Sequence, residues 1–467
     1  MPRHAAAMPL ETDDRAAQLR ALPRTRTLVV CLALFLEGMS SSAINVQIGA
    51  VEGEFAPGPV ELQLIAGVFL ISYAGLLPLA GQLVDRSNRR TLFHLGVVLF
   101  GLGSLACALA PAAAFLVVGR FTQGAGAALS APAALALITA GLPEGPARNR
   151  AVTAYGAMGA VGFSTGLVVP GALVTALGWR SSFLVLVPIV LLVLAATWRI
   201  PPSVAHRSGR LDLPGALLLT VALGLALSLV SGVGSLTVGP LGAGAGVLVL
   251  LVGVLVRRGG VGGIPRSTFG RPRVLGAGLG LAAVFAGVLS SMFVLSLDLQ
   301  AGGGMDAYEV GLLILPQPLA FSAASRAGAA AVGRHGPGRT LAVGMLLIAT
   351  SLVLLATVTR GPSEVRILIA MAVIGIGMAL SFPAASIAAI DATPEALRGT
   401  TAGLLTTAQN VGGALGLAVV TALDVVPREH GDSATPGLLV AAALIVGGGL
   451  AAVVAARMRA PEGAHAC

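Results

Sequence analysis

Long apolar runs recur along this chain with short polar breaks between them, and they constrain its fold more than any other feature. A membrane-spanning helix needs about 20 mainly apolar residues in a row. We expect fourteen such spans, at 28–50, 62–84, 91–110, 113–134, 151–175, 181–199, 213–233, 236–256, 274–297, 309–332, 340–359, 365–389, 400–424 and 436–456. Only 10% of the residues are charged, against about 25% in a typical soluble domain. The sequence therefore predicts an all-α integral membrane protein.

The polar stretch before the seventh span divides the chain into two groups of helices. The predicted parts are a cytoplasmic tail at 1–27, a six-helix bundle at 28–199, a linker at 200–212, two inserted helices at 213–256, a second linker at 257–273, a second six-helix bundle at 274–456 and a tail at 457–467.

All 29 basic residues are arginine, and their distribution predicts the orientation in the membrane. If the N-terminus is cytoplasmic, the inner segments hold 23 arginines, the outer loops hold four, and two lie within spans. Cytoplasmic loops are enriched in positive charge, so we expect both termini in the cytoplasm and the protein in the cytoplasmic (inner) membrane. The net charge of +9 is then a topology signal, and we expect no nucleic-acid partner.

Residues 81–90, GQLVDRSNRR, follow the second span and carry the first functional motif. Gly81 allows a close helix contact, and Asp85 can pair with an arginine, which makes this loop a candidate conformational latch. The arginines concerned are Arg86, Arg89 and Arg90. Ordinary loop charge explains these arginines but not their spacing from Gly81 and Asp85.

This segment resembles the loop signature of the major facilitator superfamily, in which glycine occupies the position of Asn88. Asparagine tolerates a left-handed turn better than most residues, so we expect the loop to keep its turn there.

The fourth span contains an arginine, Arg120, about seven residues from its outer end. An ionisable residue inside a membrane is costly and marks a functional site by default. The stretch resembles the superfamily's Arg-x-x-Gln-Gly-x-Gly motif at Arg120, Gln123, Gly124 and Gly126, and in relatives this arginine is associated with proton coupling. The structural alternative is an arginine that snorkels outward or bonds backbone carbonyls.

The first span, FLEGMSSSAINVQIGAV from Phe35, resembles the signature of the fourteen-helix drug:proton antiporters. Asn45 matches the signature asparagine, Ser40 fills the aspartate position, and Glu37 lies about one helical turn earlier. A carboxyl group in a low-dielectric site favours its protonated form, which suits a group that takes up and releases protons. The alternative is a glutamate neutralised by an arginine or kept protonated for packing.

Glycines in the fifth span are spaced to form a groove on one helix face. They are Gly159, Gly162 and Gly166, followed by Pro170, which can bend the helix, and Gly171. This run resembles the antiporter motif of exporters, although the motif's Gly-Pro pair is displaced here, with Leu167 after Gly166.

The second half matches the family less closely. Its repeat of the charged loop, GRHGPGR, has Gly333 at the aspartate position, and Arg326 is a second embedded cation that either contacts substrate or snorkels to the cytoplasm. The candidate residues of the substrate cavity are Ser40, Asn45, Gln63, Tyr73, Gln123, Arg326, Gln409 and Asn410.

The resemblance implies the major facilitator fold, two six-helix bundles plus two inserted helices, with the substrate site between the bundles near the midplane. It implies proton-coupled efflux of a drug, antibiotic or secondary metabolite, with Glu37 and Arg120 as the coupling residues. Two embedded arginines against one embedded glutamate favour a neutral or anionic compound. We expect no cofactor beyond the proton gradient, no metal, and a monomer in the lipid bilayer.

Two alternatives to export stay open on the sequence: a proton-coupled importer of a small polar metabolite, and a membrane sensor that transports nothing. Aromatic residues make up only 4% of the chain, few for a sugar-type importer. An enzyme is not predicted, because the six histidines lie at span edges, in loops or in tails. The chain contains no lysine, which excludes an ATP-binding Gly-Lys-Ser loop of its own.

Overall fold

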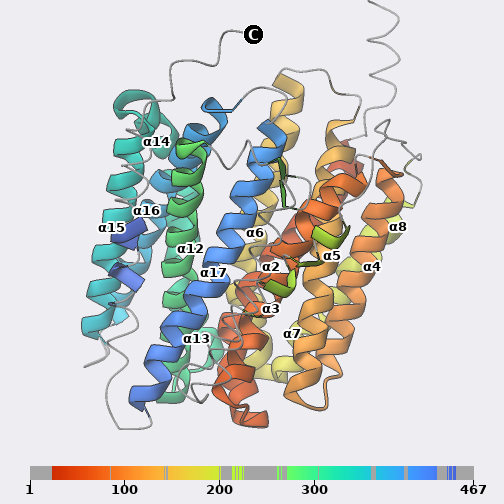
Figure 1. The fold of residues 1–467 in the computed structure, drawn as a ribbon. Coiled ribbons are helices and arrows are strands. Elements are labelled where there is room, and N and C mark those ends of the chain that lie inside the picture. Colours follow the sequence, from red (N-terminus) through yellow and green to blue (C-terminus); the bar gives the residue numbers. More distant parts are fainter. Residues whose placement is uncertain are drawn as a thin grey trace, which may run out of the picture.

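In the computed structural model of this protein, almost all described residues are helical, and the helices run side by side (Figure 1). The structure describes residues 24–198, 200, 271–358 and 364–428, with gaps at 85, 141, 143–145, 303 and 394–397, and scattered residues within 213–225, 260–265 and 439–448. Within this part, ten helical stretches are long and apolar enough to cross a membrane.

The first bundle contains seven helical segments. They are α2 (Arg24–Phe55), α3 (Pro59–Val84), α4 (Arg89–Ala108), α5 (Ala113–Thr139), α6 (Pro146–Leu177), α7 (Trp179–Leu184) and α8 (Leu186–Thr197). A two-residue antiparallel pair, β1 (Gly260–Val261) with β2 (Ile264–Pro265), precedes the second bundle. That bundle contains α12 (Pro272–Leu297), a π-helical turn η1 (Asp298–Gly302), α13 (Ala307–Ile314), α14 (Pro316–His335), α15 (Pro337–Val358), α16 (Glu364–Asp391) and α17 (Arg398–Arg428).

Most predicted spans coincide with helices, and two of those described are interrupted. The span expected at 181–199 is divided at Val185 into α7 and α8. The span expected at 309–332 is divided at Leu315 into α13 and α14. Proline lacks a backbone donor and its ring crowds the preceding turn, and both Pro316 and Pro318 stand at this break. The spans expected at 236–256 and 436–456, and most of that at 213–233, lie outside the described residues; 213–222 is described in part and is helical.

The two bundles repeat the same close packing of helices through glycine. Gly126 of α5 packs on the backbone of Gly96 in α4. In the second bundle, Gly377 of α16 packs on Gly344 of α15 in the same way. Small residues let membrane helices approach closely, and here they do so at equivalent positions in each half.

The pairing of α2 with α6 recurs as the pairing of α12 with α17. A Cβ on Gly162 would overlap the backbone of Phe35, and one on Gly412 would overlap that of Ala282. The sequences ALSAPAA at 128–134 and ALSFPAA at 379–385 align α5 with α16 in the same repeat. By this correspondence, the position equivalent to Arg120 in the second half is Met371, and the position equivalent to Glu37 is Val284.

Part of the contact between the bundles is a seam formed by the C-terminal halves of α2, α6 and α12 with η1 and α13. On one side of this seam the Ser296 hydroxyl donates a hydrogen bond to the Asn45 carbonyl, and Gly49 packs against the Gln300 side chain. On the other side, Gly311 packs on the Leu167 backbone. In the orientation that the arginines predict, this seam lies at the outer end of the molecule.

Candidate functional site

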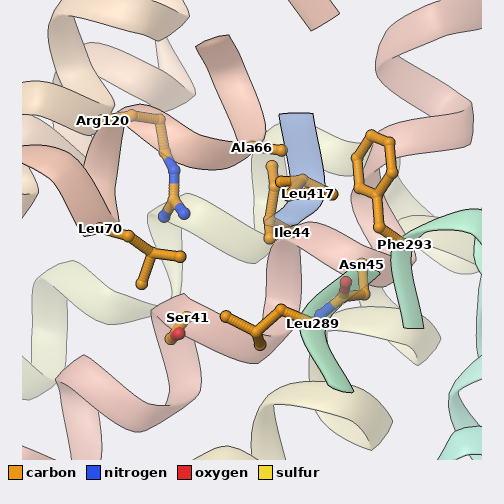
Figure 2. A pocket seen from close by; sticks show the side chains of 9 residues that line it. All are labelled: Ser41, Ile44, Asn45, Ala66, Leu70, Arg120, Leu289, Phe293 and Leu417. Carbon is orange, nitrogen blue, oxygen red and sulfur yellow. The ribbon is translucent and has the colours of Figure 1, made fainter. Parts of the chain in front are cut away.

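A small pocket lies between the two bundles, where α2, α3, α5, α12 and α17 meet (Figure 2). Its polar lining consists of Ser41, Asn45 and Arg120. Its apolar lining consists of Ile44, Ala66, Leu70, Leu289, Phe293 and Leu417. Because the lining comes from both bundles, any rocking of one bundle against the other changes the shape of this pocket.

Arg120 is the charged residue of the pocket, and it is only 1% exposed. Its Nη1 donates to the hydroxyl and carbonyl oxygens of Ser40, at 2.9 and 3.2 Å, and to Oε1 of Gln123 at 3.2 Å. Its Nε donates to the Ile65 carbonyl at 3.4 Å, and its guanidinium lies 4.8 Å from the ring centre of Phe69. The arginine thus ties α5 to α2 and α3 through neutral groups.

Glu37 lies deeper along α2 and is also buried, at 4% exposure. The Ser130 hydroxyl on α5 donates to its Oε1 at 3.1 Å, and Tyr73 on α3 lies beside the same carboxyl group. The other oxygen, Oε2, is enclosed without a hydrogen-bond partner. A buried carboxyl group with so few donors around it is costly to ionise.

Glu37 and Arg120 do not bond each other. Their partners on α5, Ser130 and Gln123, are two turns apart, about 10 Å along the helix. The two residues therefore form no ion pair with each other, and each is held by neutral partners of its own. No group of three or more His, Cys, Asp or Glu in the described ranges could hold a metal.

Two more of the cavity candidates lie near the pocket. Gln123 links Arg120 to the Ser104 hydroxyl at 2.8 Å, and Gln63 donates to the Ala418 carbonyl of α17 at 3.5 Å. Both glutamines are fully buried. Gln63 therefore joins the two bundles directly, between α3 and α17.

Three candidates from the second half lie away from the pocket lining. Arg326 is exposed on α14, which favours its reading as a surface cation. Gln409 and Asn410 are half-buried on α17, where the Asn410 amide donates to the Thr406 carbonyl of its own helix at 2.9 Å.

The glycine groove of α6 faces α2, as its spacing indicated. Gly159 packs on the Leu34 side chain, and Gly166 packs on the Met39 backbone. The Ser42 hydroxyl closes the same contact by donating to the Phe163 carbonyl at 2.7 Å. Further along α6, Pro170 is buried and Gly171 packs on the start of α13.

The loop 81–90 differs from expectation at two points. No atom of the described chain lies within 4 Å of a Cβ built on Gly81, so the expected close contact is not made there. Asn88 does not adopt a left-handed turn: its φ is −64°, and its side chain accepts a bond from the Arg90 amide as the N-cap of α4. Asparagine is among the best N-cap residues, which explains its presence.

The arginines of this loop have different surroundings. Arg90 donates to the Ile200 carbonyl at 2.7 Å and lies 6.0 Å from the Trp198 ring centre, while Arg89 Nε is enclosed without a partner. Arg86 is half-buried. Asp85, the proposed acid of the latch, lies outside the described residues.

Two groups of functional interest, Ser130 and Arg180, were not among the predicted site residues. Ser130, the partner of Glu37, could have been noticed because ALSAPAA recurs in the second half. Arg180 donates to Glu54 at 2.7 Å and lies 4.3 Å from the Trp179 ring centre, and it ties the end of α2 to α7. This pair is nearly half exposed, so it contributes about 0–1 kcal/mol.

Comparison with known proteins identifies the family to which this architecture corresponds. Residues 30–417 match the family model described as Major Facilitator Superfamily. The chain is 31% identical over 417 residues to the methylenomycin A resistance protein of Streptomyces coelicolor, covering 87% of each. It is 33% identical over 416 residues to a cephamycin export protein of Amycolatopsis lactamdurans, covering 85% of this chain and 84% of that one.

Solved structures show the same fold at low sequence identity. A crystal structure of the peptide transporter POT in complex with sulfate superposes with a TM-score of 0.70 at 14% identity, covering 94% of this chain and 97% of that one. The family assignment has three supports. They are the two repeated bundles, the helices long enough to span a membrane, and the family match along most of the sequence. The chain belongs to the Major Facilitator Superfamily.

Proposed function

We propose that this protein exports a small, antibiotic-like organic compound of neutral or anionic charge from the cytoplasm, in exchange for protons. The observation that carries the proposal is the placement of a buried glutamate and a buried arginine on the helices that line a pocket between the bundles. The named resistance and export relatives support the direction of transport. The protein would act as a monomer in the cytoplasmic membrane with both termini inside.

Helix α2 connects the parts of this mechanism. Glu37, Ser40 and Asn45 lie along it within about 12 Å. Glu37 is the proposed proton site, Ser40 accepts from Arg120, and the Asn45 carbonyl accepts from Ser296 at the seam. A proton on Glu37 removes a buried charge between α2 and α5 and so changes the preferred packing of α2. The seam at Asn45 then opens or closes with the protonation of Glu37, which is the coupling that an antiporter needs.

Transport into inverted membrane vesicles tests this function. The compounds would be methylenomycin A, a cephamycin, a neutral antibiotic and a dicationic dye, with and without an acid interior. We expect accumulation of the neutral or anionic compounds only when the vesicle interior is acid. Export without any effect of the pH gradient would contradict proton coupling, and accumulation only in right-side-out vesicles would show an importer.

Opening of the seam can be tested by cross-linking. Cysteines at Gly49 and Gln300, in a protein whose own cysteines are replaced, would face each other across α2 and η1, because a Cβ on Gly49 would lie 2.9 Å from the Gln300 Cβ. Oxidation should form a disulfide and stop transport, and reduction should restore it. A cross-linked protein that transports at the full rate would show that the seam stays closed during the cycle.

A further inference from the structure

The pocket between the bundles contains a buried positive charge that makes no ion pair with the described part of the chain. Every hydrogen bond of Arg120 goes to a neutral oxygen, on Ser40, Ile65 or Gln123. Glu37, the buried acid on the neighbouring helix α2, contacts Ser130 and Tyr73 instead. A buried charge without a partner is unfavourable, so this arginine is prepared to receive a negative charge from outside the chain.

Unused hydrogen-bond donors of the lining surround the same space. Nη2 of Arg120 makes no hydrogen bond to any residue that the structure describes, and Figure 2 shows the guanidinium pointing from α5 toward Ser41. The Ser41 hydroxyl makes no hydrogen bond to the described chain, and the Asn45 amide uses its nitrogen for one bond only, to the Ser42 carbonyl at 3.0 Å. The lining contains no carboxylate. The polar groups on this surface are therefore suited to an anion.

We propose that the pocket binds a carboxylate group of the exported compound through Arg120, with Ser41 and Asn45 as neutral donors. Arginine pairs with carboxylates through strong, charge-assisted hydrogen bonds. The apolar part of the compound would pack on Leu289, Phe293 and Leu417 from the second bundle. This proposal rests on the proposed export function and narrows its substrate to acids.

Ser40 offers a way to test the charge of this site without removing the arginine. Its hydroxyl accepts from Arg120 Nη1 at 2.9 Å, so an aspartate there would neutralise the guanidinium from within the protein. Ser40→Asn changes the same contact without adding charge. Arg120→Gln removes the charge itself, and Ser40→Asp keeps the test valid if that variant fails to fold.

The experiment measures binding to the full-length purified protein by thermal shift, with a cephamycin that has one carboxylate and with its methyl ester. We expect the wild-type protein to bind the acid about tenfold or more tightly than the ester. Ser40→Asp should weaken binding of the acid by a similar factor and leave the ester unchanged. Ser40→Asn should weaken the acid by about threefold or less, since a neutral contact is altered and no charge is added.

Three results would overturn the proposal: equal binding of acid and ester, undiminished binding of the acid by Ser40→Asp, or no binding of either compound. Vesicle transport separates this failure from failure of the export function. If the acid binds as expected but no compound crosses the membrane, the carboxylate site stands and export is wrong. If neutral compounds are exported while the acid is neither bound nor moved, export stands and the carboxylate site is wrong.

Discussion

Replacing Glu37 with glutamine should abolish transport against a gradient while leaving the protein folded. Glutamine has nearly the same size and can still accept from Ser130, but it cannot release a proton. A variant fixed in the neutral form cannot switch between the two protonation states, so proton flow down its gradient can no longer drive transport. The measurement is accumulation of the transported compound in inverted vesicles with an acid interior, which should fall to the level of vesicles without the protein.

Energy-independent exchange distinguishes a coupling defect from a general one. Vesicles preloaded with unlabelled compound should still exchange it for labelled compound through the Glu37→Gln variant, because the pocket and the seam are intact. Glu52→Gln, on the same helix but half-exposed near its end, is the matched control and should pump normally. Ser130→Ala removes the one hydrogen bond to Glu37 Oε1 and should weaken pumping without abolishing it. Uphill accumulation by Glu37→Gln would contradict the role assigned to this residue.

Valine at Gly162 should cause a large loss of stability. A Cβ at this position overlaps the backbone of Phe35 in α2, and backbone cannot move aside as a flexible side chain can. Overpacking usually costs about 1–3 kcal/mol, and we expect the upper end or more here. Thermal unfolding of the purified protein should show a clear fall in Tm, together with loss of transport, because α2 carries Glu37 and lines the pocket.

The repeat supplies both a second test and a control. Gly412→Val should be similarly damaging, because Gly412 meets the Ala282 backbone in the equivalent contact of the second bundle. Gly156→Val, on the same helix as Gly162, meets nothing within 4 Å. Since valine also has a better helix propensity than glycine, this variant should keep its Tm or raise it slightly. Equal melting of the Gly156 and Gly162 variants would show that helix propensity, and not packing, determines the effect.

The helices were predictable because a bilayer needs long apolar segments of nearly fixed length, and the hydropathy of this chain shows them directly. The glycine groove at Gly159, Gly162 and Gly166 followed from helical periodicity alone. The interruption at Leu315 was missed, although Pro316 and Pro318 signal it, because both prolines stand inside a continuous apolar run. Asn88 was assigned the wrong conformation, because asparagine suits a left-handed turn and a helix N-cap equally well.

The partners of the charged residues could not be predicted, because they depend on the rotation and depth of each helix. Glu37 was identified from its helix, but its contacts with Ser130 and Tyr73 come from two other helices. Arg120 was expected to influence Glu37, whereas the structure engages it with Ser40 and Gln123. Residue type and hydropathy indicate that a charge is buried, and only the packing shows what it faces.

The unequal chemistry of the two repeated bundles affects how such a transporter can diversify. The two halves have matching glycine contacts, while the positions of Glu37 and Arg120 hold Val284 and Met371 in the second half. Mutations among the apolar residues of that half can alter the shape of the pocket without touching Glu37 or Arg120. A producer of a new antibiotic could therefore acquire resistance through substitutions in the second half of an existing exporter, while Glu37 and Arg120 in the first half stay the same.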